Sequence, residues 1–225
     1  TLSGNEVALS QLDGGVFALA NVHTVALDLA TSTNPQSFSA ASGAGLTITG
    51  DLTLGAGLSL AGSGGAISLS GSIGGAAGLS TDGTGTYTLS GDNSYAGSTS
   101  VNSGTLVASH GQALGATTAW TTVADGATLA LQGGITLASE ELTLNGSGAA
   151  GGGALRNVGQ SNTVTGPIIL AMSATIHVVV VGDVLIISGD ISGGPTAGLT
   201  FTGLGTTTLT VANAYQGATT ISGGT

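Results

Sequence analysis

The sequence predicts an all-β protein, a right-handed parallel β-helix of roughly ten rungs. Its composition is the first reason. Gly accounts for 42 of the 225 residues, hydrophobic residues for 41 %, and charged residues for only 5 %, whereas soluble domains carry about a quarter charged residues. Arg156 is the single basic residue and Met172 the single methionine. Strong helix formers are therefore scarce, and the abundant Thr, Ser, Val and Gly favour strands and turns.

Short alternating runs are the second reason. Each run is followed within a few residues by Gly, Asn or Asp, which is typical of short strands joined by tight turns. The runs lie at 46–49, 52–54, 66–70, 127–131 and 142–144. We expect Val, Ile, Leu and Ala to point inward and Thr, Ser, Asn and Asp outward. The most apolar segment, 174–187, predicts two buried strands with a turn at Gly182-Asp183 between them.

An internal repeat is the third reason. Residues 83–105 align without a gap on 203–225, at an offset of 120. Upstream, 66–73 aligns on 184–191, and weaker similarity extends further. We therefore expect residues 1–225 to form one continuous solenoid segment of a longer chain. It would hold two copies of a unit of about 120 residues, the first lacking its beginning and the second cut at its end.

An antiparallel β-sandwich pair is the alternative fold, because strand spacing alone does not separate the two. The unit is too long for one solenoid repeat, which has about 20–45 residues. With about 20 residues per rung and about 4.8 Å between strands, the solenoid would be a rod about 50 Å long. The aromatic content of 3 % and the abundant Gly favour the solenoid.

Charge and cysteine content exclude several classes of function. The formal net charge of −10 argues against binding to nucleic acid, which needs Lys and Arg to neutralise phosphates. It also disfavours anionic lipid. The sequence contains no Cys, so it can form neither disulfides nor thiolate metal sites. No apolar run is long enough to cross a bilayer, and we expect no membrane insertion of this segment.

The acidic residues and the single arginine are the candidates for catalysis. Glycoside hydrolysis needs two carboxyl groups about 5–9.5 Å apart. Asp183 with Asp190 could stack on adjacent strands, and Glu140 or Glu141 could face an acid on another rung. The two aspartates each follow a Gly, as turn residues do, and acids that open an alternating run usually face solvent. Arg156, the only candidate lyase base, has no basic neighbour. We predict no catalytic residue and no enzyme activity.

The histidines and the tryptophan offer no stronger site. His23, His110 and His177 stand alone in the sequence and lack the short spacings of metal ligands. Trp120 could stack on a sugar, but a corner or core position is the expectation. We predict no metal site and no cofactor, and leave open isolated calcium binding by turn acids.

The repeated segment resembles a known family motif. It is similar to the autotransporter-associated β-strand repeat, also called the passenger-associated transport repeat, over 83–109 and again over 203–225. The second copy departs from the motif at Val211, where the family has Gly, so its central turn is expected to differ. The matching positions are Gly83, Gly85, Thr86, Thr88, Leu89, Ser90, Gly91, Asn93, Tyr95, Gly97, Thr99, Val101, Asn102, Gly104, Thr105 and Leu106, then Gly203, Gly205, Thr206, Leu209, Asn213, Tyr215, Gly217, Thr219, Thr220, Gly224 and Thr225.

The resemblance implies a β-helical autotransporter passenger or adhesin-like protein on the outer surface of a Gram-negative bacterium. Such repeats are thought to assist secretion and folding of the stalk. We expect Asn93 and Asn213 to satisfy backbone groups at bends, and Tyr95 and Tyr215 to cover the end of a rung. The expected function is structural: a stalk, an adhesin shaft, or a segment of an extracellular filament or biofilm matrix.

Possible partners of such a rod are copies of itself, end to end or side by side, and a surface glycan or protein receptor. The alternative function is a glycan-binding or glycan-processing β-helix of the lyase, hydrolase or tailspike type.

Overall fold

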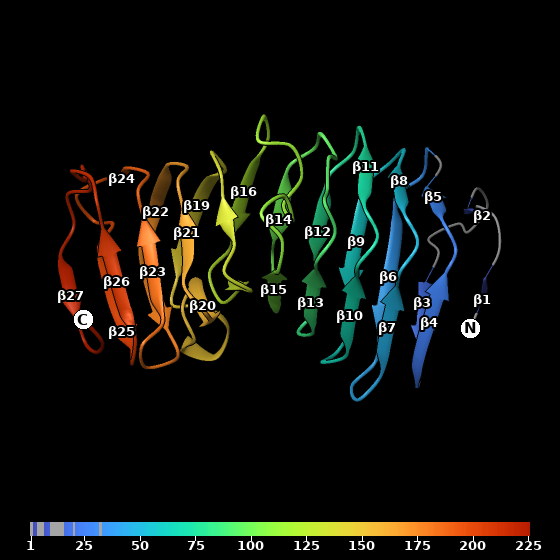
Figure 1. The fold of residues 1–225 in the computed structure, drawn as a ribbon, viewed down its shortest axis with the longest axis horizontal. Coiled ribbons are helices and arrows are strands. Elements are labelled where there is room, and N and C mark those ends of the chain that lie inside the picture. Colours follow the sequence, from blue (N-terminus) through green and yellow to red (C-terminus); the bar gives the residue numbers. More distant parts are fainter. Residues whose placement is uncertain (1, 4–6, 10–15, 20, 32) are drawn as a thin grey trace.

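The protein is a rod, as seen in the computed structural model, which describes residues 2–3, 7–9, 16–19, 21–31 and 33–225 (Figure 1). The colours advance steadily from the N-terminal end to the C-terminal end, so the chain winds along one axis. Its strands stack turn upon turn as a β-solenoid. All strand pairings among the described residues are parallel, as between β10 and β13. This confirms the predicted parallel β-helix, and the alternative of antiparallel sandwiches is wrong.

The strands form three columns that run along the rod. Column A holds the strands β1 (Leu2–Ser3), β4 (Val22–Ala26), β7 (Gly45–Ile48), β10 (Ala66–Leu69), β13 (Thr86–Leu89), β15 (Thr105–Ala108), β17 (Thr128–Gln132), β20 (Leu155–Gly159), the second half of β22 (Ile168–Val178), β25 (Leu199–Gly203) and β27 (Thr219–Ile221).

Column B holds β3 (Val16–Leu19), β6 (Gln36–Ala40), β9 (Leu58–Ala61), β12 (Leu79–Thr81), β14 (Thr99–Val101), β16 (Trp120–Val123), β19 (Glu141–Gly146), the first part of β22, and β24 (Ile191–Gly193). Column C holds β2 (Val7–Leu9), β5 (Leu29–Thr31), β8 (Leu52–Leu54), β11 (Ile73–Gly75), β18 (Thr136–Leu137), β21 (Asn162–Val164), β23 (Val184–Ile187) and β26 (Thr206–Leu209). One short 3-10 helix, η1 (Ala149–Gly151), lies in the turn between β19 and β20. Among the described residues, no helix is long and apolar enough to span a membrane.

Side chains alternate between the interior and the surface, as the sequence predicts. In column A the inward residues Leu46, Ile67 and Tyr87 are Cα partners on successive turns, and each is at most 1 % exposed. The outward neighbours are hydroxyl residues such as Ser68 and Thr88. Burial of apolar area, at about 25 cal/mol per Å², therefore accumulates turn by turn. The segment 174–187 forms part of β22 and β23 with a turn at Gly182, which confirms that prediction.

Glycine is needed where column A leads into column C. A Cβ on Gly71 would lie 2.0 Å from the carbonyl oxygen of Gly50, and a Cβ on Gly91 would lie 2.1 Å from that of Gly71. Neighbouring turns therefore approach more closely here than any side chain permits.

The two copies of the long unit lie in different columns. In the first copy β12 and β14 belong to column B, whereas their sequence equivalents, β25 and β27, pair in column A. Likewise β10 is in column A, but its equivalent β23 is in column C. In column A, five successive strand pairings connect β10 with β22, and the chain then passes from column A to β23 in column C. One unit thus spans five turns and a third.

Candidate functional site

The turn between β13 and β14 contains a buried asparagine that joins three turns of the solenoid. The backbone N–H of Ile73 donates a hydrogen bond to Oδ1 of Asn93 at 2.9 Å. Nδ2 of Asn93 in turn donates to the carbonyl oxygen of Ala113 at 2.7 Å. Asn93 is only 2 % exposed, so each of these bonds satisfies a group that water cannot reach. The expectation that Asn93 satisfies backbone groups at a bend is confirmed.

A tyrosine and a threonine close the same turn. The hydroxyl of Tyr95 lies 2.6 Å from Oγ1 of Thr99, and that Oγ1 donates to the carbonyl oxygen of Leu114 at 3.1 Å. Tyr95 is fully buried, so it is a core residue and does not cover the end of a rung as predicted. Burial raises the pKa of Tyr95 above its usual range, and Thr99 opposes part of that effect.

A close approach of the backbone completes the arrangement. A Cβ on Gly97, four residues after Asn93, would lie 2.3 Å from the backbone nitrogen of Gly78 on the preceding turn. We use the name asparagine clamp for Asn93, the backbone N–H of Ile73 that donates a hydrogen bond to it, and Gly97. It draws one turn onto the previous one through a hydrogen bond at the start of the bend and through direct backbone contact at its end.

The second copy repeats the asparagine clamp. The N–H of Ile191 donates to Oδ1 of Asn213 at 2.8 Å, and the Tyr215 hydroxyl lies 2.6 Å from Oγ1 of Thr219. A Cβ on Gly217 would lie 2.4 Å from the carbonyl carbon of Ala197. Residues 206–221 have the same secondary structure as residues 86–101 at every position. The order of strands and bends is therefore the same in both copies. The turn at Val211 differs in its contacts: Val211 carries a side chain where Gly91 admits no Cβ, and Nδ2 of Asn213 donates to the carbonyl oxygen of Val211 rather than to the following turn.

Sequence reasoning did not predict the threonine partners of the tyrosines. Thr99 and Thr219 matched the motif, but an outward position was expected of threonine in general. The available signal was spacing: each threonine follows its tyrosine by four residues in both copies. A tyrosine and a threonine that recur together at fixed spacing in an apolar setting indicate a buried hydrogen-bonded pair.

Glu140 also lies inside the solenoid, contrary to the expectation that it faces solvent. It is 4 % exposed, and Oγ1 of Thr121 donates to its Oε1 at 2.7 Å. Burial raises the pKa of Glu140 to about 7, the hydrogen bond from Thr121 opposes this rise, and the charge of Glu141 adds to it. Thr121 is the Cα partner of Thr99, so a short polar strip crosses an otherwise apolar core.

The remaining acids are not brought together as proposed for catalysis. Asp183 and Asp190 lie at the two ends of β23, on the same turn of the solenoid, so they do not stack on adjacent strands.

Arg156 is the Cα partner of His177, whose Nδ1 lies 2.9 Å from Oγ1 of Thr202. Burial and the neighbouring Arg156 lower the pKa of His177.

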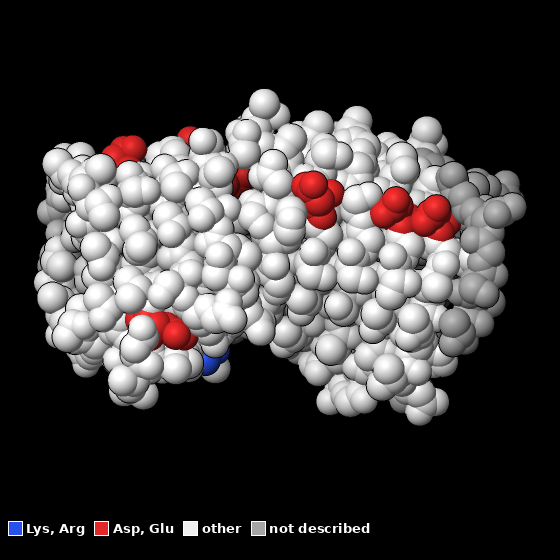
Figure 2. Space-filling view, in the orientation of Figure 1, with Lys and Arg blue, Asp and Glu red and all other residues white. Residues whose placement is uncertain are grey.

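The other histidines lie apart from one another. His23 is exposed, and Nδ1 of His110 accepts a hydrogen bond from the N–H of Gln112 at 3.2 Å. Within the part of the chain that the structure describes, no three His, Asp or Glu side chains are grouped as metal ligands. Figure 2 shows the acidic side chains as small separate patches along the rod, with the one basic side chain on the same view.

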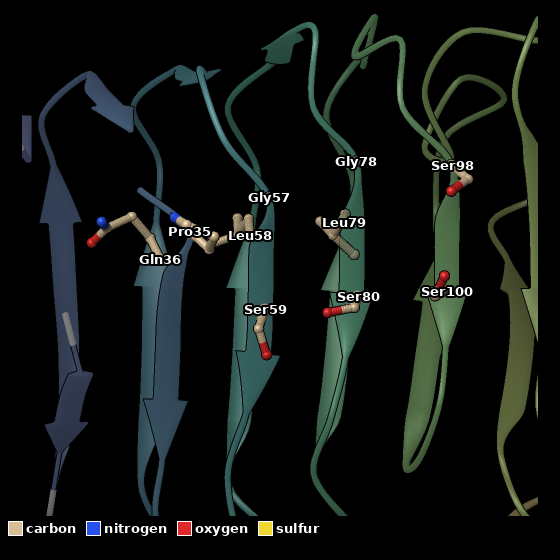
Figure 3. A pocket seen from close by; sticks show the side chains of 10 residues that line it. All are labelled: Pro35, Gln36, Gly57, Leu58, Ser59, Gly78, Leu79, Ser80, Ser98 and Ser100. Carbon is tan, nitrogen blue, oxygen red and sulfur yellow. The ribbon is translucent and has the colours of Figure 1, made fainter. Parts of the chain in front are cut away.

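A shallow groove of about 300 Å³ lies on the outside of column B. Figure 3 shows its lining across β6, β9, β12 and β14, with the hydroxyls of Ser59, Ser80 and Ser100 on three neighbouring strands. Gly57, Gly78 and Ser98 also line it. Since Thr99 is the Cα partner of Thr121, Trp120, one residue earlier, continues the row of Gly57, Gly78 and Ser98 on the next turn. Its side chain is 55 % exposed, so a core position is wrong; Trp120 is the first residue of β16 and directly follows a bend.

Asp82 lies beside these serines. Its carboxylate accepts hydrogen bonds from Ser80 at 2.6 Å, Ser59 at 2.7 Å and Asn102 at 2.7 Å. Partial burial alone would raise the pKa of Asp82, but the bonds from Ser80, Asn102 and Ser59 outweigh it and hold the pKa below its usual value. An ionised carboxylate and several hydroxyls thus meet in one place on the surface.

The fold and the clamps define a β-solenoid built from sequence repeats. The passenger-associated-transport-repeat family model matches it twice, at residues 79–108 and 199–225. The chain thus carries two passenger-associated transport repeats, as the resemblance implied, and each contains one asparagine clamp. Comparison with curated proteins and with solved structures gave no match.

Proposed function

We propose that this chain is a rod-like stalk segment of a secreted or cell-surface autotransporter passenger, and that its repeats promote stacking of the solenoid. The observation that carries the proposal is the asparagine clamp, which occurs in both repeats with hydrogen bonds of 2.9 and 2.8 Å to the preceding turn. In a solenoid each turn contacts only its neighbours. A group that binds the turn before it therefore couples successive steps of folding.

A structural role rather than an enzymatic one fits the placement of the acids. Glu140 is turned into the core, and β23 separates Asp183 from Asp190. Glycoside hydrolysis would need a carboxyl pair flanking an accessible bond. We propose that the chain acts through its length and its surface.

The proposal is tested in the full-length protein on intact Gram-negative cells. Antibodies against the rod segment and added protease should both reach it at the cell surface. A variant with Asn93→Ala and Asn213→Ala should reach the surface in reduced amount, because turns stack less readily without the clamps. Confinement of the wild-type segment to the cell interior would refute the proposed location.

Binding of a neutral saccharide is a second candidate function, which the groove on column B favours. Trp120 is exposed at 55 % and continues the row of groove residues. Aromatic faces stack on apolar faces of sugars, and hydroxyls and carboxylates bind sugar hydroxyls, as in ligand sites that combine an apolar wall with a few polar groups. Since the net charge is −10, a neutral saccharide suits the groove better than an acidic one.

Neutral oligosaccharides on an array are the probe for this second function. Binding by the wild-type chain should fall at least about tenfold in Trp120→Ala and in Asp82→Asn, the loss expected when a hot-spot contact is removed. Leu204→Ala is the matched control, because Leu204 is 68 % exposed and belongs to another part of the rod. No binding by the wild type, or equal binding by all variants, would exclude this groove.

A further inference from the structure

A third segment has the spacing of the two clamps although no repeat was matched there. The three nine-residue stretches 93–101 (NSYAGSTSV), 162–170 (NTVTGPIIL) and 213–221 (NAYQGATTI) align without gaps. Each begins with Asn, has Gly four residues later, and ends with a branched apolar residue. The middle stretch lies outside the segments 79–108 and 199–225 that match the family model.

The Oδ1 contact of Asn162 repeats that of the two clamps. The N–H of Ile135, on the preceding turn, donates to Oδ1 of Asn162 at 2.7 Å. Nδ2 of Asn162 donates to Oδ1 of Asn157 and to the carbonyl oxygen of Gly159 at 3.0 Å. Asn162 is completely buried, so its amide is held as firmly as that of Asn93. The donor on the preceding turn is an isoleucine N–H in all three places.

The glycine of the third stretch also makes the same approach. A Cβ on Gly166 would lie 2.0 Å from the carbonyl oxygen of Glu140 on the turn before. Gly97 and Gly217, its counterparts, allow no Cβ for the same reason. Both elements that define a clamp, the asparagine bond and the backbone contact, are therefore present at 162–170.

The third stretch differs from the two repeats in the residues that replace the buried Tyr–Thr pair. This exchange explains why 162–170 resembles the repeat motif only weakly. Val164 and Ile168 stand where the repeats have Tyr and Thr, and both are completely buried. Replacing one partner of a buried hydrogen bond leaves the other unsatisfied, whereas replacing both by apolar groups leaves no polar group unpaired. The exchange of both residues removes two motif positions and keeps the core intact.

We propose that residues 162–170 form a third asparagine clamp, with Asn162 as its positioning residue. The proposal rests on the role given above to the clamps in stacking the rod. Asn162 begins β21 in column C, and Asn93 lies three turns earlier, in the bend that follows β11 on the next turn of the solenoid. The third clamp therefore couples turns in the middle of the unit between the two matched repeats.

Hydrogen exchange of single amides tests the assignment in the 225-residue chain. In Asn162→Ala the Ile135 amide should exchange at least about tenfold faster than in the wild type, relative to amides elsewhere in the core. In Asn93→Ala the Ile73 amide should accelerate by a similar factor while Ile135 does not. Unchanged protection of Ile135 in Asn162→Ala would overturn the proposal.

A measurement on the wild type covers the case in which Asn162→Ala does not fold. A scalar coupling across the hydrogen bond should connect the Ile135 nitrogen with the Cγ carbon of Asn162, as it should connect Ile73 with Asn93 and Ile191 with Asn213. Its absence for Ile135 alone would refute the third clamp. Because these readouts do not depend on secretion, they distinguish failure of the third clamp from failure of the proposed location.

Discussion

The first and second repeats have the same local geometry but different burial. The Tyr–Thr distance is 2.6 Å in both, yet Tyr95 is fully buried and Tyr215 is half-buried. Asn93 reaches up to Ala113 on the following turn, whereas Nδ2 of Asn213 donates to the carbonyl oxygen of Val211, two residues away. The clamp is therefore formed by its own nine residues and the turn before it, and the turn after it supplies burial.

We expect the same substitution to lower the free energy of unfolding by different amounts in the two repeats. In residues 1–225 taken by themselves, Tyr95 is enclosed by turns on both sides, so its removal loses packing and hydrogen bonds together, whereas Tyr215 keeps partial access to water. Paired substitutions in the two repeats measure what the following turn contributes.

The tyrosines give the largest expected difference. Tyr95→Ala should lower the free energy of unfolding by about 3–5 kcal/mol, because it leaves a cavity in a closed core. Tyr215→Ala should cost about 1 kcal/mol, since its ring is partly exposed already. Urea unfolding of the two variants checks this, and equal losses would show that the following turn adds nothing.

The asparagines should show a smaller difference of the same sign. Asn93→Ala leaves the Ile73 N–H and the Ala113 carbonyl without their partner, which costs about 2 kcal/mol. Asn213→Ala should cost about 1 kcal/mol, because it breaks one bond to another turn. Calorimetric melting of both variants is the measurement. A larger loss at Asn213 would reverse the interpretation of the two repeats.

Glu140 makes the stability of the buried region depend on pH. Its pKa is about 7 in the folded protein against 4.5 for the free group, so its contribution is fully present below pH 4.5 and is lost as the pH rises through 7. The wild type should lose on the order of 3 kcal/mol between these limits through this group. Glu140→Gln should abolish that part of the pH dependence, whereas Glu141→Gln should retain it. Urea unfolding across the pH range decides the matter.

Val211 gives the smallest expected effect. It stands where the first repeat has Gly91, keeps the same bend, and is 43 % exposed. Val211→Gly should change the free energy of unfolding by less than about 0.5 kcal/mol, as is usual for surface substitutions. The reverse change, Gly91→Val, should be severe, because a Cβ there would lie 2.1 Å from the Gly71 oxygen.

The architecture was predictable because inward apolar residues and outward polar residues alternate along each strand with a period of two. The alternation in 66–70 and 127–131 fixes which side chains face inward, and glycine with asparagine marks the bends. The motif itself identified Asn93 and Asn213 as bend residues, and their backbone bonds confirm that reading.

The misplaced residues were those whose position depends on a neighbouring turn. Trp120 starts β16 and Glu140 directly precedes the adjacent strand β19, and the Trp120 side chain is exposed whereas that of Glu140 is buried. An isolated sequence does not reveal which turn lies beside which, so it could not tell that Thr121 stands ready to donate to Glu140. The rotation of the second repeat by one column escaped prediction for the same reason.

That rotation relates consecutive units by a threefold screw. The outward Ser100 of the first repeat lies in column B, and its equivalent Thr220 lies in column A. A shaft extended by the same unit would return to its starting orientation only at every third copy. Any surface feature carried once per unit would then follow a spiral around the shaft, so that the shaft would present it in three directions.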